Sequence, residues 1–178
     1  MSYRLIVPIF LFAFVILGCK SNYHEKRINS QMQKRQYDEN LIIANRGLIS
    51  RDSSKIVGIL RARGWDMNVS ETGLWYQVLD KGDGPKAQEG QVAELEYKLR
   101  LINNKLVYSS DSTGPLRFRI SKGGVERGLE EGMLYLSEGD SARFILPPYM
   151  AHHLLGDQNK IPPRAIIIYE VRLNSLLN

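Results

Sequence analysis

The sequence of 178 residues has one cysteine, Cys19, and only three histidines. A lone cysteine excludes a disulfide within the chain, and with it the class of small secreted proteins that disulfides hold together. Two of the histidines, His152 and His153, are adjacent, which would suit a metal site or an acid–base site. Neighbouring residues of an extended chain point to opposite sides, so the sequence disfavours a metal ion held by both.

Long apolar runs are also scarce. The longest, Leu5–Leu17, has thirteen residues and is too short to span a bilayer core of about 30 Å. It follows a short, positively charged start and precedes Gly18 and Cys19. This order resembles the signal peptide and lipobox of bacterial lipoproteins, which predicts a signal peptide at residues 1–18 and lipidation of Cys19. The alternative is an ordinary cysteine in an uncleaved anchor.

The positive charge is concentrated near the N-terminus. Residues 20–63 contain ten Lys/Arg and four acidic residues. Residues 64–178 contain thirteen Lys/Arg and fifteen acidic residues. A basic arm could bind nucleic acid, but an anchored, exported protein rarely meets any. We therefore interpret the arm as a solvated spacer that favours anionic lipid headgroups, with no nucleic-acid partner. No acidic run follows Cys19, which favours the periplasmic face of the outer membrane.

The arm divides into two patterns. Residues 19–37 are polar without an apolar stripe, which predicts a flexible tether. From Asp38 to Gly64 apolar residues recur at helical spacing, which predicts a short helical arm of two helices. Asp52 or Ser53 could begin the second helix and Gly64 could end it.

From residue 65 to 178 the pattern becomes that of an α+β domain. Within residues 92–102, positions 93–101 alternate between apolar or aromatic and charged residues, as in a strand with one buried face. Val125, Leu129, Met133 and Leu136 recur at the spacing of one helix face. The expected fold is a curved antiparallel β-sheet, a half-barrel, wrapped around one short helix.

The same region resembles the FKBP-type peptidyl-prolyl cis-trans isomerases. The resemblance covers residues 72–173 and rests on "GLEEG" at Gly128–Gly132, "EGD" at Glu138–Asp140, "IPP" at Ile161–Pro163 and the closing strand "YEVRL". With "RGW" at Arg63–Trp65 and "TGLWY" at Thr72–Tyr76, the chain is similar to the FKBP-like lipoproteins of Bacteroidetes-type bacteria, some of which are associated with gliding motility.

The resemblance implies a pocket that grips a proline ring between apolar side chains, with no nucleophile, metal or cofactor. Residue by residue, the family's catalytic pocket falls on Tyr97, Phe118, Val125, Leu129, His152, Ile161 and Tyr169, and further substrate-binding positions fall on Val107, Tyr108, Leu116 and Glu126. Five of them could equally be plain core, because they lie on inward faces of strands or the helix: Tyr97, Val125, Leu129, Ile161 and Tyr169. For His152 the alternative is plain loop surface.

Several positions depart from the family pattern. Tyr108 stands at the family's Asp, Glu126 at an Ile whose backbone binds the substrate, and His152 at a Tyr whose hydroxyl donates to the substrate carbonyl. An imidazole N–H could keep that role. A charged imidazole without a partner is costly in an apolar pocket, so we expect activity to fall below about pH 6.5.

Two functional classes follow from the resemblance. The first is an isomerase that assists the folding of exported, proline-containing polypeptides, acting as a lipid-anchored monomer in the cell envelope. The second is a catalytically weak binding module, a chaperone or an assembly factor, which the departures at Tyr108 and His152 favour.

Overall fold

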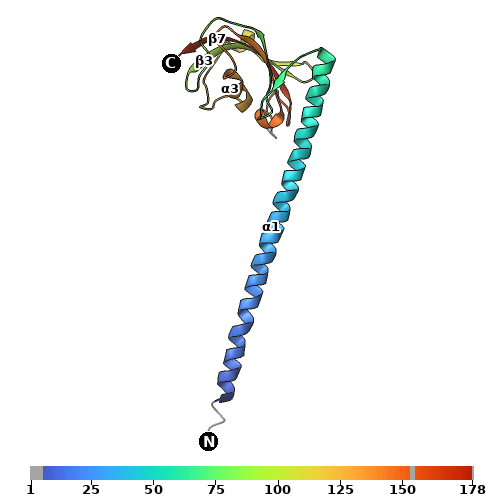
Figure 1. Ribbon diagram of the computed structural model, residues 1–178, viewed down its shortest axis with the longest axis vertical. Coiled ribbons are helices and arrows are strands. Elements are labelled where there is room, and N and C mark those ends of the chain that lie inside the picture. The colour runs from blue at the N-terminus through green and yellow to red at the C-terminus, as the bar shows by residue number, and fades with distance from the viewer. Residues whose placement is uncertain (1–5, 153–154, 178) are drawn as a thin grey trace. The chain divides into compact units, whose positions relative to one another are not determined.

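The computed structural model describes residues 6–152 and 155–177 (Figure 1). The chain consists of two compact units, residues 1–48 and 49–178. The elements in chain order are α1 (Ile6–Arg63), β1 (Asn68–Val69), β2 (Trp75–Asp80), β3 (Val92–Leu101), β4 (Leu106–Ser109), α2 (Ser110–Thr113), β5 (Leu116–Arg119), α3 (Arg127–Met133), β6 (Ser141–Leu146), the 3-10 turn η1 (Pro148–Met150) and β7 (Ile167–Leu177).

Helix α1 differs from the sequence-based expectation. It is continuous through the predicted tether and the two predicted short helices. The polar stretch from Glu25 to Gln36 is rich in Lys, Arg, Gln and Glu, which are good helix formers even without an apolar face. The predicted second N-terminus is helix interior, where Ser54 Oγ donates to the carbonyl of Ser50 at 2.9 Å. The predicted end is confirmed, since Gly64 follows the helix with φ +63°.

The predicted signal peptide and lipid anchor stay predictions. Residues 1–5 and His153 lie outside the residues that the structure describes. The contacts of the Cys19 side chain are not described either. Among the helices that the structure describes, none is long and apolar enough to cross a membrane.

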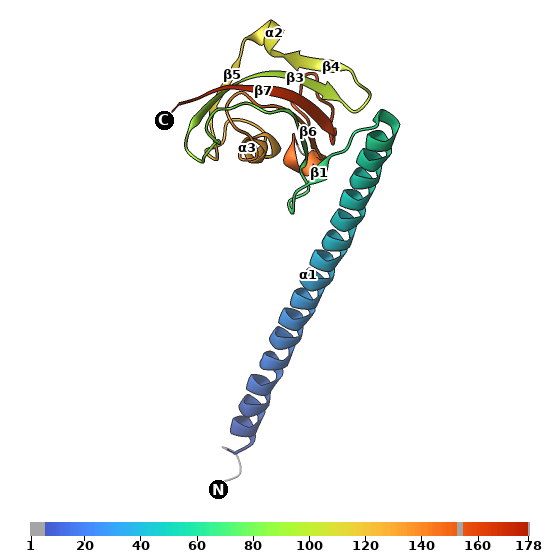
Figure 2. The same ribbon diagram turned by 45° about the horizontal axis from the view of Figure 1, so that its top comes forward.

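In the second unit, the strands that the structure describes form one antiparallel sheet of seven. The order is β1-β2-β6-β7-β3-β4, and β5 pairs with β3 beside β4. β3 and β7 run side by side at its centre, and the sheet curves around α3 (Figure 2). The expected α+β fold, a curved antiparallel sheet around one short helix, is confirmed.

Strand β3 shows the predicted alternation. Leu95, Leu99 and Leu101 are buried on the concave face, whereas Glu96 and Lys98 are exposed on the other. The turn that follows has Asn104 at φ +70°, the conformation expected of this asparagine. The alternation therefore places Tyr97 on the inner face, beside the helix.

Helix α3 is shorter than the sequence pattern suggests. It spans Arg127–Met133, so Val125 precedes it and Leu136 follows it. Gly128 and Gly132 bring it close to the sheet, because a Cβ at Gly132 would lie 2.8 Å from the Phe144 ring. This close packing fixes the start of α3, and with it the residue just before it, Glu126, against the sheet.

The last turns of α1 belong to the second unit. Ile56 and Leu60 pack with Ile145, Ile166 and Ile168 in an apolar cluster separate from the main core, and Trp65 and Met67 pack against it. Asp52, 5% exposed, binds Arg164 with 2.8 Å between Oδ2 and Nη2. Because Arg164 lies in the segment between η1 and β7, this ion pair ties the helix to the loop that carries His152.

Candidate functional site

A cavity of about 570 Å³ opens on the concave side of the sheet. Its walls come from β3, β4, β5, the start of α3, the end of η1 and β7. The lining residues are Tyr97, Leu99, Tyr108, Leu116, Gly124, Val125, Glu126, Arg127, Ala151, His152 and Tyr169. The rings of Tyr97 and Tyr169 lie 6.0 Å apart at 52°, although the residues are far apart in sequence. The inner faces of two neighbouring strands bring them together.

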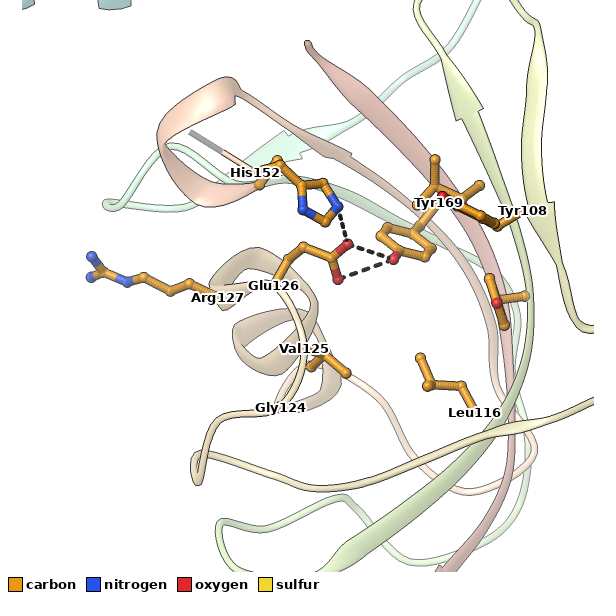
Figure 3. A pocket seen from close by; sticks show the side chains of 11 residues that line it. Tyr108, Leu116, Gly124, Val125, Glu126, Arg127, His152 and Tyr169 are labelled. Atoms are coloured by element: carbon orange, nitrogen blue, oxygen red, sulfur yellow. Dashed lines mark hydrogen bonds and ion pairs between the residues drawn. The ribbon is translucent and has the colours of Figure 1, made fainter. Parts of the chain in front are cut away.

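One wall of the cavity is polar. Tyr169, 3% exposed, donates from its hydroxyl to the Glu126 carboxylate, with 3.0 Å to each oxygen. His152 Nε2 lies 2.7 Å from Glu126 Oε1. Figure 3 shows the carboxylate between the imidazole and the phenol, and Arg127 pointing away from them.

The contacts among these three side chains shift their pKa values. Burial acts to raise the pKa of Glu126, but hydrogen bonds from His152, the backbone and Tyr169 outweigh it and lower this pKa below its ordinary value. The Glu126 carboxylate raises the pKa of His152 against the opposing effect of burial. Burial, followed by the charge of Glu126, raises the pKa of Tyr169 well above its ordinary value. Glu126 and His152 therefore each favour the charged form of the other.

This contact removes the reason for which activity was expected to fall at acidic pH. The sequence-based argument placed an unpaired imidazolium in an apolar pocket, where its charge would be costly. Glu126 Oε1 lies 2.7 Å from Nε2 and supplies the opposite charge. A charged His152 is therefore stabilised in this pocket, and the expected effect of pH changes sign.

A second polar pair closes another side of the cavity. The Tyr108 hydroxyl donates to the Asp157 carboxylate, and the Lys160 ammonium lies 5.0 Å from the Tyr108 ring centre. Burial acts to raise the pKa of Asp157, but hydrogen bonds from Tyr108 and from the backbone of Asn159 and Ile161 lower it to about 2. Tyr108, at the family's Asp position, is thus paired with an Asp from the facing loop.

The structure brings seven of the eleven pocket residues proposed from the sequence into one cavity. These are Tyr97, Val125, His152, Tyr169, Tyr108, Leu116 and Glu126. The other four, Val107, Phe118, Leu129 and Ile161, are buried in the hydrophobic core behind it. Leu129 is fully buried in α3 and does not line the cavity.

Sequence reasoning missed Leu99, Gly124, Arg127 and Ala151 in the lining, and Asp157 beside it. Leu99 could have been found, because it shares the inner face of β3 with Tyr97. Asp157 carries a weaker signal: its Oδ1 accepts from the backbone N–H of Asn159 at 2.9 Å, an Asx turn typical of Asp in loops. Nothing in the local sequence indicates its contact with Tyr108.

We expect the stability of this domain to peak between about pH 4.5 and pH 6.5, the ordinary pKa values of Glu and His. The pKa of His152 is raised, so its contribution is complete below about 6.5 and is lost as pH rises through the folded value. The pKa of Glu126 is lowered, so its contribution is complete above about 4.5 and is lost as pH falls. Urea unfolding at stepped pH measures this, and a His152→Gln variant should lose the decline on the alkaline side. A decline that remained unchanged in that variant would contradict the assignment.

Comparisons with known proteins give one consistent result. The family described as FKBP-type peptidyl-prolyl cis-trans isomerase matches residues 84–174, just over half of the chain. The probable FKBP-type peptidyl-prolyl cis-trans isomerase FkpA of Neisseria meningitidis serogroup B is 32% identical over 108 residues, which cover 60% of this chain and 39% of that protein. FkpA of Escherichia coli K12 gives the same identity and coverage.

A solved structure agrees with these sequence matches. The crystal structure of AtFKBP13 superposes with a TM-score of 0.58 at 29% identity, and the match covers 62% of this chain and 98% of that one. In contrast, the match spans only 39% of either FkpA sequence. The similarity thus concerns the sheet-and-helix domain that contains the cavity.

Proposed function

Because this chain belongs to the family of FKBP-type peptidyl-prolyl cis-trans isomerases, we propose that it catalyses rotation about X-Pro bonds in polypeptide substrates. The observation that carries the proposal is the cavity on the concave face, where Tyr97, Leu116, Val125 and Tyr169 meet. These side chains could surround a proline ring with apolar and aromatic surface, which is the recognition that this reaction needs.

The proposed mechanism uses no covalent intermediate. Rotation about an X-Pro bond disrupts amide resonance, and the unaided reaction takes tens to hundreds of seconds. The twisted amide is less polar than the planar one, so a pocket that excludes water favours it over the ground state. The residues of the cavity would grip the ring and hold the peptide while the bond rotates, and no metal or cofactor takes part.

The direct test is isomerisation of a short proline peptide, followed by NMR exchange spectroscopy without a coupling protease. We expect the full chain in detergent micelles to accelerate exchange between the cis and trans peaks in proportion to its concentration. A Val125→Glu variant, which puts a charge on the apolar wall, should abolish the acceleration. Equal exchange with and without the protein would refute the proposed activity.

The second candidate function is a binding module that keeps the fold with weak catalysis. Three polar residues of the lining favour it, because Glu126, His152 and Tyr108 replace the family's usual residues. Such a module would bind proline-containing clients as a chaperone or as an assembly factor, for example for gliding-motility machinery. Tight binding of a proline peptide without acceleration of exchange would select this function over the first.

We further propose that the protein acts in the cell envelope on exported polypeptides, as a monomer held at the membrane by lipid on Cys19. The support is the short apolar run followed by Gly18 and Cys19. A lipid chain on the mature N-terminus would leave the first basic residues that follow it, Lys20 and Lys26, close to anionic headgroups. The periplasmic face of the outer membrane is the location that this sequence favours.

We expect Cys19→Ala to abolish lipid labelling. Cells that express the wild type should incorporate a radioactive or clickable fatty acid into the protein, whereas the variant should run as an unlabelled precursor or appear outside the membrane fraction. The same experiment with Ser21→Ala, two positions along the chain, is the matched control and should keep the label. Equal labelling of wild type and Cys19→Ala would contradict the anchor.

A further inference from the structure

The contact with Glu126 determines which N–H groups of the His152 ring remain for another hydrogen bond. Nε2 lies 2.7 Å from Glu126 Oε1. A neutral imidazole has one N–H. If that proton lies on Nε2, facing the carboxylate, then Nδ1 can only accept a hydrogen bond. If it lies on Nδ1, the lone pair of Nε2 faces a carboxylate oxygen, which is unfavourable. Only the protonated ring satisfies Glu126 and still has a second N–H to donate.

The surroundings of the ring favour this protonated form. Glu126, whose side chain is 11% exposed, faces it from the residue before α3, and Asp157 adds negative charge from the loop after η1. From β7, Tyr169 binds the same carboxylate. The cation Arg127, at the start of α3, points away from the ring (Figure 3). Tyr97 and Tyr108 line the same cavity.

The second N–H is available to a ligand. The His152 side chain is 27% exposed and belongs to the cavity lining. Among the residues that the structure describes, none accepts a hydrogen bond from Nδ1. A carbonyl oxygen of a bound X-Pro peptide is an acceptor of the right kind. A charged donor holds such an oxygen more strongly than a neutral one does.

We propose that Glu126 is a positioning residue: it holds His152 as an imidazolium whose second N–H binds a carbonyl oxygen of the X-Pro substrate, while Tyr169 holds Glu126 in place. This inference rests on the proposed isomerase function and deepens it. It gives Glu126 and His152 a single role in place of two unrelated departures from the family pattern. Its consequence is that substrate binding and turnover weaken as pH rises, because deprotonation of His152 removes the donor.

The first experiment measures the protonation of His152 directly. The full chain in micelles is labelled with ¹³C-histidine, and the three ring signals are titrated by NMR, with His24 and His153 as internal references. We expect the pKa of His152 to lie above that of the references in wild type and to move toward them in Glu126→Gln. The matched control is Glu89→Gln, an exposed glutamate outside the cavity, which should leave the pKa unchanged.

The second experiment follows kcat and KM for a proline peptide against pH by NMR exchange. For wild type we expect kcat/KM to fall as pH rises through the pKa of His152. In Glu126→Gln the fall should occur at lower pH, with a loss of about tenfold near pH 7.5, as expected when a charge-assisted hydrogen bond is lost. Tyr169→Phe should move the midpoint in the same direction by less. A merely structural role of Glu126 would lower activity equally at every pH.

The outcomes separate this inference from the function on which it rests. A midpoint shared by wild type and Glu126→Gln would overturn the inference even if the chain isomerises proline peptides. A His152 pKa that is insensitive to Glu126→Gln would overturn it as well. Absence of isomerisation together with a raised, Glu126-dependent pKa would refute the proposed function and support the role of Glu126 in holding the ring.

Discussion

Replacing Tyr169 with alanine should lower the free energy of unfolding by about 3–5 kcal/mol and abolish binding of a proline peptide. Tyr169 is 3% exposed and lies in β7, where Leu99 of β3 and Phe144 of β6 are its direct partners across the sheet. Removing the ring leaves a cavity at the centre of the sheet and takes away one wall of the pocket. It also removes the hydroxyl that donates to Glu126.

Urea unfolding followed by tryptophan fluorescence measures the stability, and NMR titration of the peptide measures binding. Tyr169→Phe separates the ring from the hydroxyl: it should keep most of the packing and lose about 1–2 kcal/mol, because a buried carboxylate loses one donor. If the alanine variant fails to fold, Tyr169→Leu still tests the pocket, since it fills part of the space without an aromatic face. Wild-type affinity in the folded leucine variant would show that the ring does not contact the ligand.

The fold could be predicted because its main signals are local and periodic. The alternation of residues 93–101 placed Tyr97 and three leucines on one face, and the structure confirms this face as the inner one. The short helix and the curved sheet around it followed from the same patterns. The extent of α3 was misjudged, because glycines at 128 and 132 let a short helix pack closely where the apolar spacing alone suggested a longer one.

The continuous helix α1 shows a limit of pattern reasoning. Absence of an apolar stripe indicates that a segment packs against nothing, but not that it is unstructured. The side chains of residues 26–46 that the structure describes are exposed, and the segment is helical all the same. Intrinsic propensity decides here, since Lys, Arg, Gln and Glu favour the helix without tertiary contacts.

The polar wall of the cavity could not be predicted from the sequence in the same way. Glu126 and His152 were each placed in the pocket by the resemblance, but as separate departures from the family. Their contact depends on two loops that the sheet and α3 bring together, and no spacing rule predicts it. The correction of the expected pH dependence follows from that contact alone, because a counter-charge reverses the cost of protonating a buried histidine.

A double-mutant cycle should reveal this coupling in the stability of the domain. We expect His152→Phe to cost about 2–4 kcal/mol at pH 6, somewhat less than the 3–5 kcal/mol for breaking a fully buried pair, because the His152 side chain is 27% exposed. The loss arises because the Glu126 carboxylate stays buried without its counter-charge. Glu126→Ile should cost less, since an unpaired His152 can release its proton and become neutral.

The double variant Glu126→Ile/His152→Phe should be more stable than His152→Phe alone, because an apolar pair needs no counter-charge. The coupling energy should be about 2 kcal/mol at pH 6 and should decrease at alkaline pH, where His152 is neutral in the wild type. The ion pair of Arg117 and Glu94 serves as the control, because the Arg117 side chain is 68% exposed and its cycle should give less than about 1 kcal/mol. Additive costs at Glu126 and His152, or a coupling no larger than that of the surface pair, would show that the two side chains lie close together without stabilising one another.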